Sequence, residues 1–243
     1  MAKKRLDALL AERYPELSKT FIQSIIMQGK VSVDGVKVTK PGTQIAPDAR
    51  IEADLEEPKY VSRAGFKLEK ALEHFGIEVK NYVVLDAGLS TGGFTDCLLQ
   101  HGAQKVYGID VGYGQVHEKI RQDERVVVME RTNLRHLEAL PEPVDLVTLD
   151  LSFISVLKVM DTVVQNLKPD GKLIVLIKPQ FEAEKHQVGK GGVIKDAAVH
   201  QEVIDKVVEG IKAYGFDLVG VLDSPIEGAT GNKEFLAYFN KSS

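Results

Sequence analysis

The chain contains 243 residues, of which 44% are hydrophobic and 27% are charged, an ordinary composition for a globular protein of one or two domains. No apolar stretch follows the charged N-terminus, and no apolar run is long enough to cross a bilayer. We therefore expect a cytoplasmic protein with neither a secretory signal nor a membrane segment. The single cysteine, Cys97, excludes an intramolecular disulfide and a zinc site built from several cysteines.

The net charge of −4 is unevenly distributed along the chain. Residues 1–55 hold nine basic and seven acidic side chains, a balance of +2, which leaves −6 for the remainder. Phosphate binding depends on where positive charges cluster and not on their total. The composition therefore permits a nucleic-acid partner without requiring one.

The first part of the chain has the pattern of two helices followed by a hairpin. Leucines recur at helical spacing over 6–10, and Ser18 stands where an N-cap would precede a helix with apolar residues over 21–26. Gly29 ends that helix, and 31–38 alternate apolar and polar residues around an Asp-Gly turn. We expect a small α+β N-terminal domain over 1–56, a linker over 57–62 and a larger domain over 63–243.

The larger domain alternates predicted strands with predicted helices and belongs to the α/β class. Near-continuous apolar runs predict strands at 82–86, 106–110, 126–129, 144–150, 172–178, 216–222 and 234–239. Such strands form a mostly parallel sheet with helices on both faces. Right-handed crossovers then bring the strand ends, and any ligand, to one edge of that sheet.

A glycine-containing turn follows the first of these strands and opens a helix. Glycines allow the backbone to approach a ligand, and an acid at the strand end offers an acceptor. The spacing differs from the Gly-x-Gly-x-x-Gly of dinucleotide folds and resembles the methyltransferase loop that binds the methionine part of S-adenosylmethionine. A nicotinamide site and a turn without a ligand remain alternatives. The cofactor residues that this resemblance implies here are Asp86, Gly88, Ser90, Gly92, Gly93 and Phe94.

Two further residues are candidates for the cofactor site. Asp110 ends the second strand, where a carboxylate can accept both hydroxyls of a ribose, although it could instead cap the turn that follows. Asn133 lies just after the third strand, where methyltransferases of this kind contact the adenine. The pair of strands at the end of the chain also resembles that superfamily, whose Rossmann-like sheet has an antiparallel last strand.

The acceptor of the methyl group can be narrowed from the residues after the fourth and fifth strands. Methylation of amino groups usually uses an Asp/Asn-Pro-Pro-aromatic turn, but the residues from Asp150 to Phe153 contain no proline. Methylation of pyrimidine carbon five needs a cysteine nucleophile, and Cys97 more plausibly packs in a helix. A ribose hydroxyl needs a neighbouring base, such as a lysine whose pKa is lowered by its surroundings. Asp150 and Lys178 end adjacent strands and could partner each other.

The resemblance then extends over nearly the whole chain. Motifs at 62–68, 85–94, 178–181 and 231–235, together with Asp150, resemble the TlyA family of FtsJ-like ribosomal RNA 2′-O-methyltransferases, some of which are labelled hemolysins. The resemblance implies a catalytic tetrad of Lys67, Asp150, Lys178 and Glu234. In that tetrad Lys178 is the general base, and Lys67 and Glu234 tune charge and place the ribose. Asp150 orients Lys178 and, lying near the methyl donor, is also the ninth implied cofactor residue. Surface ion pairs are the alternative interpretation. The resemblance implies no metal.

The N-terminal segment resembles the RNA-binding domain named after ribosomal protein S-four. In that domain the second helix presents basic side chains to RNA phosphate. The chain has Ser-Lys where that family more often has Ser-Arg, which keeps the charge but loses a bidentate fork. A helical cap with solvated lysines is the alternative. The implied RNA-binding residues, including one beyond the linker, are Arg5, Ser18, Lys19, Lys30, Lys37 and Arg63.

Two features qualify this assignment. The linker carries Tyr60 where the family often has tryptophan, an amino acid absent from the chain, so the coupling of RNA docking to cofactor binding is open. The polar loop over 181–196 is interpreted as a mobile substrate lid, with an ordinary surface loop as the alternative. Ribosomal RNA or ribosomal subunits are the expected partners. Rival functions are an RNA-binding protein without transferase activity, a membrane-active hemolysin, and methylation of another RNA atom.

Overall fold

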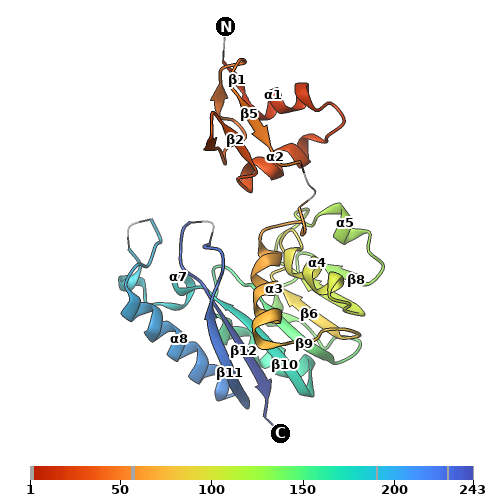
Figure 1. Ribbon diagram of the computed structural model, residues 1–243. Coiled ribbons are helices and arrows are strands. Elements are labelled where there is room, and N and C mark those ends of the chain that lie inside the picture. Colours follow the sequence, from red (N-terminus) through yellow and green to blue (C-terminus); the bar gives the residue numbers. More distant parts are fainter. Residues whose placement is uncertain (1–2, 56–57, 190, 229, 243) are drawn as a thin grey trace. The chain divides into compact units, whose positions relative to one another are not determined.

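The computed structural model describes residues 3–55, 58–189, 191–228 and 230–242. The chain divides into two compact units, Met1–Lys59 and Tyr60–Ser243, which are drawn in Figure 1. Residue 57 of the predicted linker and residue 190 of the predicted lid lie outside the described residues. The linker residues from Tyr60 onward belong to the larger unit.

The smaller unit packs two helices against short strands. Ser18 caps the second helix, because its hydroxyl accepts a hydrogen bond from the backbone N–H of Phe21 at 3.1 Å. The core is aliphatic and includes the fully buried Leu6 and Ile22. The elements are β1 (Lys4–Arg5), α1 (Leu6–Arg13), α2 (Lys19–Met27), β2 (Val31–Val33), β3 (Val36–Lys37), β4 (Gln44–Ile45) and β5 (Ile51–Ala53). Strands β3, β2 and β5 form an antiparallel sheet, and β1 pairs with β4.

The larger unit alternates strands and helices as its sequence predicts. Its helices are α3 (Ala64–Phe75), α4 (Gly93–Gln100), α5 (Glu118–Arg121), α6 (Met160–Asn166), α7 (Pro179–Glu182) and α8 (Ala197–Lys212), with short 3-10 turns η1 (Leu134–His136), η2 (Val156–Val159) and η3 (Lys185–Gln187). Its strands are β6 (Val83–Ala87), β7 (Lys105–Ile109), β8 (Val126–Met129), β9 (Val144–Leu149), β10 (Leu167–Ile177), β11 (Phe216–Asp223) and β12 (Phe235–Lys241).

Among the described residues these seven strands form one sheet in the order β11-β12-β10-β9-β6-β7-β8. Neighbours from β10 to β8 are parallel, whereas β12 runs antiparallel to both β10 and β11. The predicted α/β fold, a mostly parallel sheet with an antiparallel last strand, is confirmed. Within the part of the chain that is described, no helix is both long and apolar enough to cross a membrane.

Alternate residues of the strands face two separate cores. On β6, Val84 packs with α3 and α4, while Leu85 packs in the cluster that includes α6 and α8. The same alternation continues on β10, where Ile174 and Val175 belong to opposite cores. Figure 1 shows helices on both sides of the sheet. Because both faces are covered by helices, ligands reach the sheet at its edge.

The strand order reverses between β6 and β9. After β6 the chain builds outward through β7 and β8, and it then returns to the other side of β6 as β9. At this crossover the backbone N–H of Asp150 donates to the carbonyl of Ala87 at 2.9 Å. Open parallel sheets bind ligands at such a switch point, beyond the carboxyl ends of the strands. The geometry therefore places a candidate site between the loops that follow β6 and β9.

Tyr60 anchors the start of the larger unit. Its ring is 1% exposed and packs edge-on against Phe66 at a centroid distance of 5.2 Å, and its hydroxyl donates to Glu69 at 2.8 Å. Gly65 makes this packing possible, because a Cβ there would overlap the tyrosine side chain. The neighbouring residues therefore form a specific buried site for the Tyr60 ring.

We expect Gly65→Ala to lower the free energy of unfolding by about 3 kcal/mol, the upper end of the cost of overpacking, because Tyr60 must leave its position. Gly76 ends the same helix with φ +62° and has no atom within 4 Å of a Cβ built there, so Gly76→Ala is the control. It should cost only about 1 kcal/mol of backbone strain. Urea unfolding of both variants measures the difference, and equal losses would mean that Tyr60 is not held in place.

Candidate active site

The loop between β6 and α4 requires glycine at several positions. Gly88 has φ +92°, and a Cβ there would overlap the carbonyl oxygen of Asp150. Gly92 has φ +96°, and a Cβ on Gly93 would overlap the hydroxyl of Ser62. A non-glycine residue at any of the three would force backbone strain or displace a neighbouring segment. The glycines therefore set the close packing of the loop, and Gly88 brings it against the residues that follow β9.

Asp110 connects this loop to the next one. Its Oδ2 accepts from the N–H of Ser90 and its Oδ1 from the N–H of Gly112, each at 2.7 Å. Asp110 thus caps the turn that follows β7, which was the alternative interpretation of this residue. Each carboxylate oxygen keeps a second acceptor site, so the side chain can still receive hydroxyl groups from a ligand.

A pocket of about 430 Å³ lies at the crossover and is called here the crossover pocket. This volume is typical of small-molecule sites. Five of the nine predicted cofactor residues line it, namely Gly88, Ser90, Asp110, Asn133 and Asp150. Asn133 also caps the turn η1, because its Oδ1 accepts from the N–H of Arg135 at 3.1 Å. The remaining four, Asp86, Gly92, Gly93 and Phe94, are buried and are absent from its lining.

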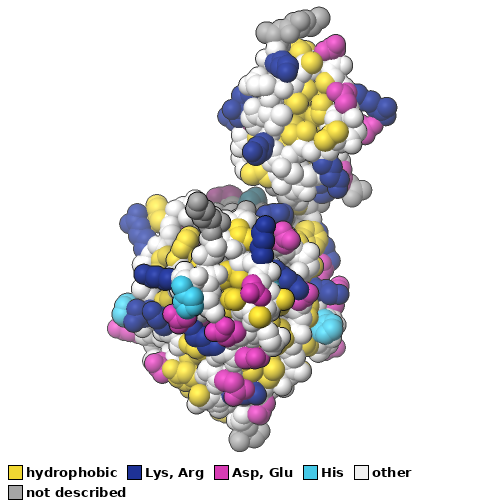
Figure 2. Space-filling view, turned by 90° about the vertical axis from the view of Figure 1, so that its left-hand side faces the viewer, with side chains coloured by type: hydrophobic (Ala, Val, Ile, Leu, Met, Phe, Trp, Pro, Cys, Tyr) yellow, Lys and Arg dark blue, Asp and Glu magenta, His cyan; other side chains and the backbone are white. Residues whose placement is uncertain are grey.

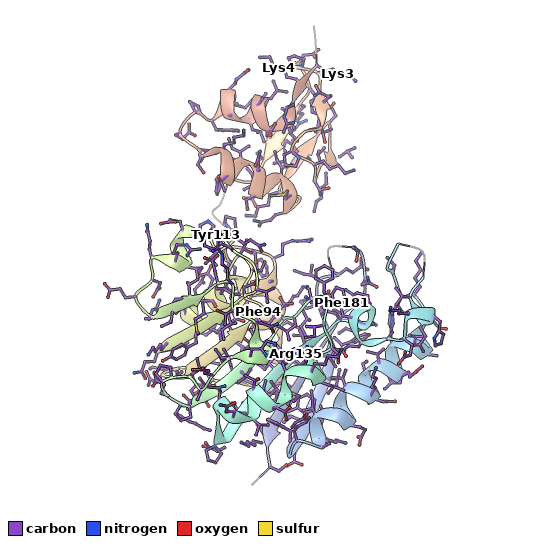
Figure 3. The ribbon with its side chains drawn as sticks, turned by 180° about the vertical axis from the view of Figure 1, so that it is seen from behind. Lys3, Lys4, Phe94, Tyr113, Arg135 and Phe181 are labelled. Atoms are coloured by element: carbon purple, nitrogen blue, oxygen red, sulfur yellow. The ribbon has the colours of Figure 1, made fainter. Side chains whose placement is uncertain are left out.

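Two of these buried residues support the loop from inside the domain. Phe94 is 2% exposed and packs in the core on the α3 and α4 face, and Figure 3 shows it inside the larger unit. Asp86 is fully buried, and its carboxylate accepts hydrogen bonds from Thr95 at 2.7 Å and Thr148 at 2.8 Å. Burial raises the pKa of Asp86 to about 6, against the opposing effect of the two threonine hydroxyls.

The four residues of the predicted tetrad form two ion pairs. Lys67 Nζ lies 2.6 Å from Glu234 Oε2, with the side chains 11% and 3% exposed. Lys178 Nζ lies 2.6 Å from Asp150 Oδ1, with the side chains 11% and 17% exposed, and it donates to the hydroxyl of Ser152 at 2.9 Å. Asp150 and Lys178 meet because β9 and β10 are parallel neighbours. Both pairs are far less exposed than ordinary surface ion pairs.

A second pocket, of about 580 Å³, is lined by all four tetrad residues and is called here the tetrad pocket. It shares four lining residues with the crossover pocket: Ser90, Asp150, Ser152 and Phe153. The two pockets therefore meet at Asp150, beside Lys178. A molecule in one pocket can present a group to a molecule in the other at this point.

Two aromatic side chains, Phe153 and Phe181, line the tetrad pocket. Phe153 has φ +66° and is 91% exposed, and its ring lies 5.0 Å from that of Phe181, centroid to centroid. Tyr113, labelled with Phe181 in Figure 3, lines neither pocket; it is 66% exposed, and the guanidinium of Arg131 lies 4.0 Å from its ring centroid. The motif at 178–181 already contained Phe181. The exposed position of Phe153 was not predicted, because Phe153 lies among other apolar residues, Leu151 and Ile154, and nothing in the sequence distinguishes it.

The predicted lid contributes to the tetrad pocket. Val188, Gly191 and Gly192 from that loop line the pocket, as do residues from a second loop, Ile226 to Gly228 and Thr230. Sequence reasoning missed the second loop, because its role depends on where β11 ends and β12 begins and not on a motif. Among the residues that the structure describes, no group of three or more His, Cys, Asp or Glu side chains is arranged to hold a metal ion.

In the smaller unit, the predicted RNA-binding residues near the helices have different environments. Arg5 forms two hydrogen bonds to the carboxylate of Asp7, at 2.9 and 2.7 Å, and this contact lowers the pKa of Asp7 to about 2. The Arg5 side chain is still 55% exposed. Ser18 is a helix cap, and Lys19 is exposed at the start of α2. Of these, Arg5 and Lys19 offer positive charge to a partner.

The other predicted RNA-binding residues lie in two places. Lys30 and Lys37 border a shallow hollow in the smaller unit, and Lys30 pairs with Asp54 at 3.1 Å. Arg63 belongs to the larger unit, where it is exposed and borders the tetrad pocket. In the view of Figure 2, basic and acidic side chains are interspersed on the surface of the larger unit. Arg63 therefore lies in the same unit as the tetrad and beside it.

The strand order, the crossover pocket and the adjoining tetrad pocket define a methyltransferase of the Rossmann-like class. A family model described as FtsJ-like methyltransferase matches residues 60–241, and an S4 domain model matches residues 4–51. The chain therefore belongs to the FtsJ-like methyltransferases. It is an S-adenosylmethionine-dependent enzyme with an N-terminal S4 domain.

Several characterised and solved proteins are similar over most of their length. Hemolysin A of Brachyspira hyodysenteriae is 45% identical over 97% of this chain and 99% of its own. The 16S/23S rRNA (cytidine-2'-O)-methyltransferase TlyA of Mycobacterium tuberculosis is 42% identical over 96% of this chain and 88% of its own. A solved structure from Streptococcus thermophilus has a TM-score of 0.78 and 37% identity, and covers 100% of this chain and 90% of that one. The expected resemblance to the TlyA family is confirmed.

Asp86 predicts a pH dependence of stability. Because its pKa in the fold is about 6 and its ordinary value is 3.8, the folded state binds the proton more tightly. Stability is therefore greatest below the ordinary pKa and falls as the pH rises through 6. We expect the free energy of unfolding of the wild type, relative to Asp86→Asn, to fall by roughly 2 kcal/mol between about pH 4 and pH 7. Urea unfolding of both proteins at several pH values provides the measurement. Free energies of unfolding that change with pH in the same way in the two proteins would contradict this prediction.

Because the Lys67–Glu234 pair is buried, we expect a substitution at Glu234 to cost more stability than one at its neighbour Lys233. Glu234→Gln leaves the ammonium of Lys67 without a counter-charge and should cost about 3 kcal/mol of stability. Lys233 is the control, because its pair with Asp223 is 2.8 Å long and exposed. Lys233→Gln should change the free energy of unfolding by less than about 1 kcal/mol. Thermal unfolding of the two variants measures both, and equal costs would mean that the buried pair is hydrated.

Proposed function

We propose that this protein transfers a methyl group from S-adenosylmethionine to the 2′-hydroxyl of a ribose in ribosomal RNA. The observation that carries the proposal is the junction of two pockets at Asp150, with Lys178 beside it. Relatives that are 42% identical over almost the whole chain bear the name 16S/23S rRNA (cytidine-2'-O)-methyltransferase. A ribosomal RNA substrate places the reaction in the cytoplasm, on RNA or on a ribosomal subunit.

The crossover pocket suits S-adenosylmethionine in size and in polar groups. Its volume of about 430 Å³ is enough for one such molecule. Asp110 retains acceptor sites for the ribose hydroxyls, and Asn133 is exposed where an adenine edge would lie. Gly88 lets the bound molecule approach the backbone. We assign Ser90 and Asp150 to the end of the pocket where the methyl group lies, because both also border the tetrad pocket.

The bound cofactor supplies an electrophilic methyl group, so the remaining chemistry is the activation of the hydroxyl. Lys178 would act in its uncharged form, after its ammonium has released a proton, and would take up the proton of the 2′-hydroxyl as the hydroxyl oxygen becomes the methyl acceptor. Asp150 and Ser152 hold the lysine in position through the contacts described above. Lys67 and Glu234 line the same pocket as an ion pair without net charge, and this pair shapes the ribose site. Proximity and orientation supply much of the rate enhancement.

RNA docking uses positive charge and exposed aromatic rings. The S4 domain contributes Arg5, Lys19, Lys30 and Lys37, and Arg63 borders the tetrad pocket. Side chains of this type position the phosphate backbone without reading its sequence. Phe153 presents an almost fully exposed ring on which an unstacked base can stack. A ribose can then reach Lys178 with its base outside the RNA helix.

We expect Lys178→Ala to lower kcat for methylation of ribosomal subunits lacking the modification by about 10²–10⁴-fold, the usual contribution of a general base. Lys168→Ala is the matched control, because Lys168 lies at the beginning of β10 and pairs with Asp145 at the beginning of β9 at 2.6 Å, whereas Lys178 and Asp150 directly follow the ends of these strands. It should retain wild-type kcat. Radiolabelled S-adenosylmethionine and digestion of the RNA to nucleosides provide the measurement.

The position of the label tests the two parts of the proposal separately. Label in a 2′-O-methyl nucleoside that is lost in Lys178→Ala supports both the reaction and the base. Label on a nucleobase would overturn the acceptor assignment. Full activity of Lys178→Ala would overturn the role of the lysine while leaving the reaction in place.

A further inference from the structure

Asn232 is a fully buried polar residue that the proposed chemistry does not use. Asn232 is 0% exposed, and its side-chain amide is hydrogen-bonded to three other residues. Oδ1 accepts from the backbone N–H of Ile194 at 3.0 Å. Nδ2 donates to the carbonyl of Gly192 and to the hydroxyl of Thr230, each at 2.9 Å. One amide therefore satisfies groups from two segments that are distant in sequence.

Both of these segments line the tetrad pocket. The first, called here the front wall, contributes Val188, Gly191 and Gly192, and it precedes α8. The second, called here the rear wall, contributes Ile226 to Gly228 and Thr230, and it leads into β12. Such loops have little secondary structure of their own to fix their positions. The amide of Asn232 ties the front wall to the rear wall.

An asparagine is well suited to this position. The front wall presents a donor at Ile194 and an acceptor at Gly192, so the bridging side chain must accept and donate at once. A carboxylate accepts only, and an aliphatic side chain does neither. Groups left unpaired inside the domain would cost stability locally, and the two walls would separate first, because the rest of the sheet does not depend on them.

The position of Asn232 also connects the walls to the tetrad. Two residues later comes Glu234, which pairs with Lys67. The carbonyl of Asn232 accepts from the N–H of Gly228 at 2.9 Å, which closes the turn of the rear wall. Gly228 itself packs closely on the Glu234 carboxylate, because a Cβ at Gly228 would lie within 2.5 Å of Glu234 Oε1. The front wall is thus held at a fixed place relative to the Lys67–Glu234 pair.

We propose that Asn232 is a positioning residue for the RNA substrate, which holds the two walls of the tetrad pocket in the arrangement that admits the target nucleotide. The proposal rests on the proposed function, since it names RNA as the molecule that enters between the walls. Asn232 does not itself line either pocket, and it acts through its hydrogen bonds to Gly192, Ile194 and Thr230. The crossover pocket does not include either wall, so cofactor binding is independent of it.

The test compares Asn232→Asp and Asn232→Ala with Asn166→Asp. Asn166 is a matched control, because it is 2% exposed and bridges two segments in the same way: its Oδ1 accepts from Leu140 N–H at 2.7 Å and its Nδ2 donates to the Thr162 carbonyl at 2.9 Å. It lines neither pocket. For each variant we would measure kcat, KM for the ribosomal substrate, the Kd of S-adenosylmethionine, and hydrogen exchange at the Ile194 amide without RNA.

We expect both Asn232 variants to raise KM for the ribosomal substrate about ten- to a hundredfold, with a smaller fall in kcat, an unchanged Kd for S-adenosylmethionine and faster exchange at Ile194. Asn166→Asp should lower the melting temperature without changing KM or the exchange at Ile194. If Asn232→Asp does not fold, Asn232→Ala decides the question.

An unchanged KM in the Asn232 variants, or an equal rise in Asn166→Asp, would overturn the proposal. The exchange measurement needs no substrate, so it separates this proposal from the proposed function. A wild-type enzyme that transfers no methyl group to ribosomal RNA would defeat the function. The tie between the walls would still be judged from exchange at Ile194, and exchange equal to that of the wild type would show that Asn232 does not hold them.

Discussion

The contact between the ends of β6 and β9 is the constraint on which the rest of the site depends. Asp150 is hydrogen-bonded to Ala87 through the backbone, and Gly88 packs against the Asp150 carbonyl with no room for a side chain. This contact fixes two loops at the point where the strand order reverses. As a result, Asp150 both lines the crossover pocket and pairs with Lys178. A displacement of either loop would therefore change the crossover pocket and the tetrad pocket at the same time.

Charge in this region is arranged in compensated pairs and not as a single-sign surface. Lys67 pairs with Glu234 and Lys178 with Asp150, while the buried Asp86 behind the loop has a raised pKa. Removing charged groups from water is costly unless each has a partner. The tetrad pocket can therefore hold four ionisable side chains in a small space.

The fold could be predicted well because its signals are local. Apolar runs identify buried strands, Ser18 and the Asp34-Gly35 turn identify a helix start and a hairpin, and the strand-end position of Asp150 and Lys178 anticipates their ion pair. What the sequence could not supply is the distinction between residues that line a cavity and residues that support it. Asp86 and Asp110 both lie at strand ends. Asp86 is buried and hydrogen-bonded to Thr95 and Thr148, whereas Asp110 lines the crossover pocket. The rear wall and the exposure of Phe153 depend on tertiary placement and have no motif.

The insertion of β12 has a consequence for the order in which the molecule assembles. This strand follows β10 and β11 in the chain but lies between them in the sheet. Until it is in place, the side of β10 that it covers is an open edge, and direct pairing of β10 with β11 would be a stable error. Glu234 immediately precedes this strand, so it can pair with Lys67 only after the strand is in place. A partly folded chain would have the crossover pocket before it has a complete tetrad, and could acquire cofactor affinity earlier than the ability to react.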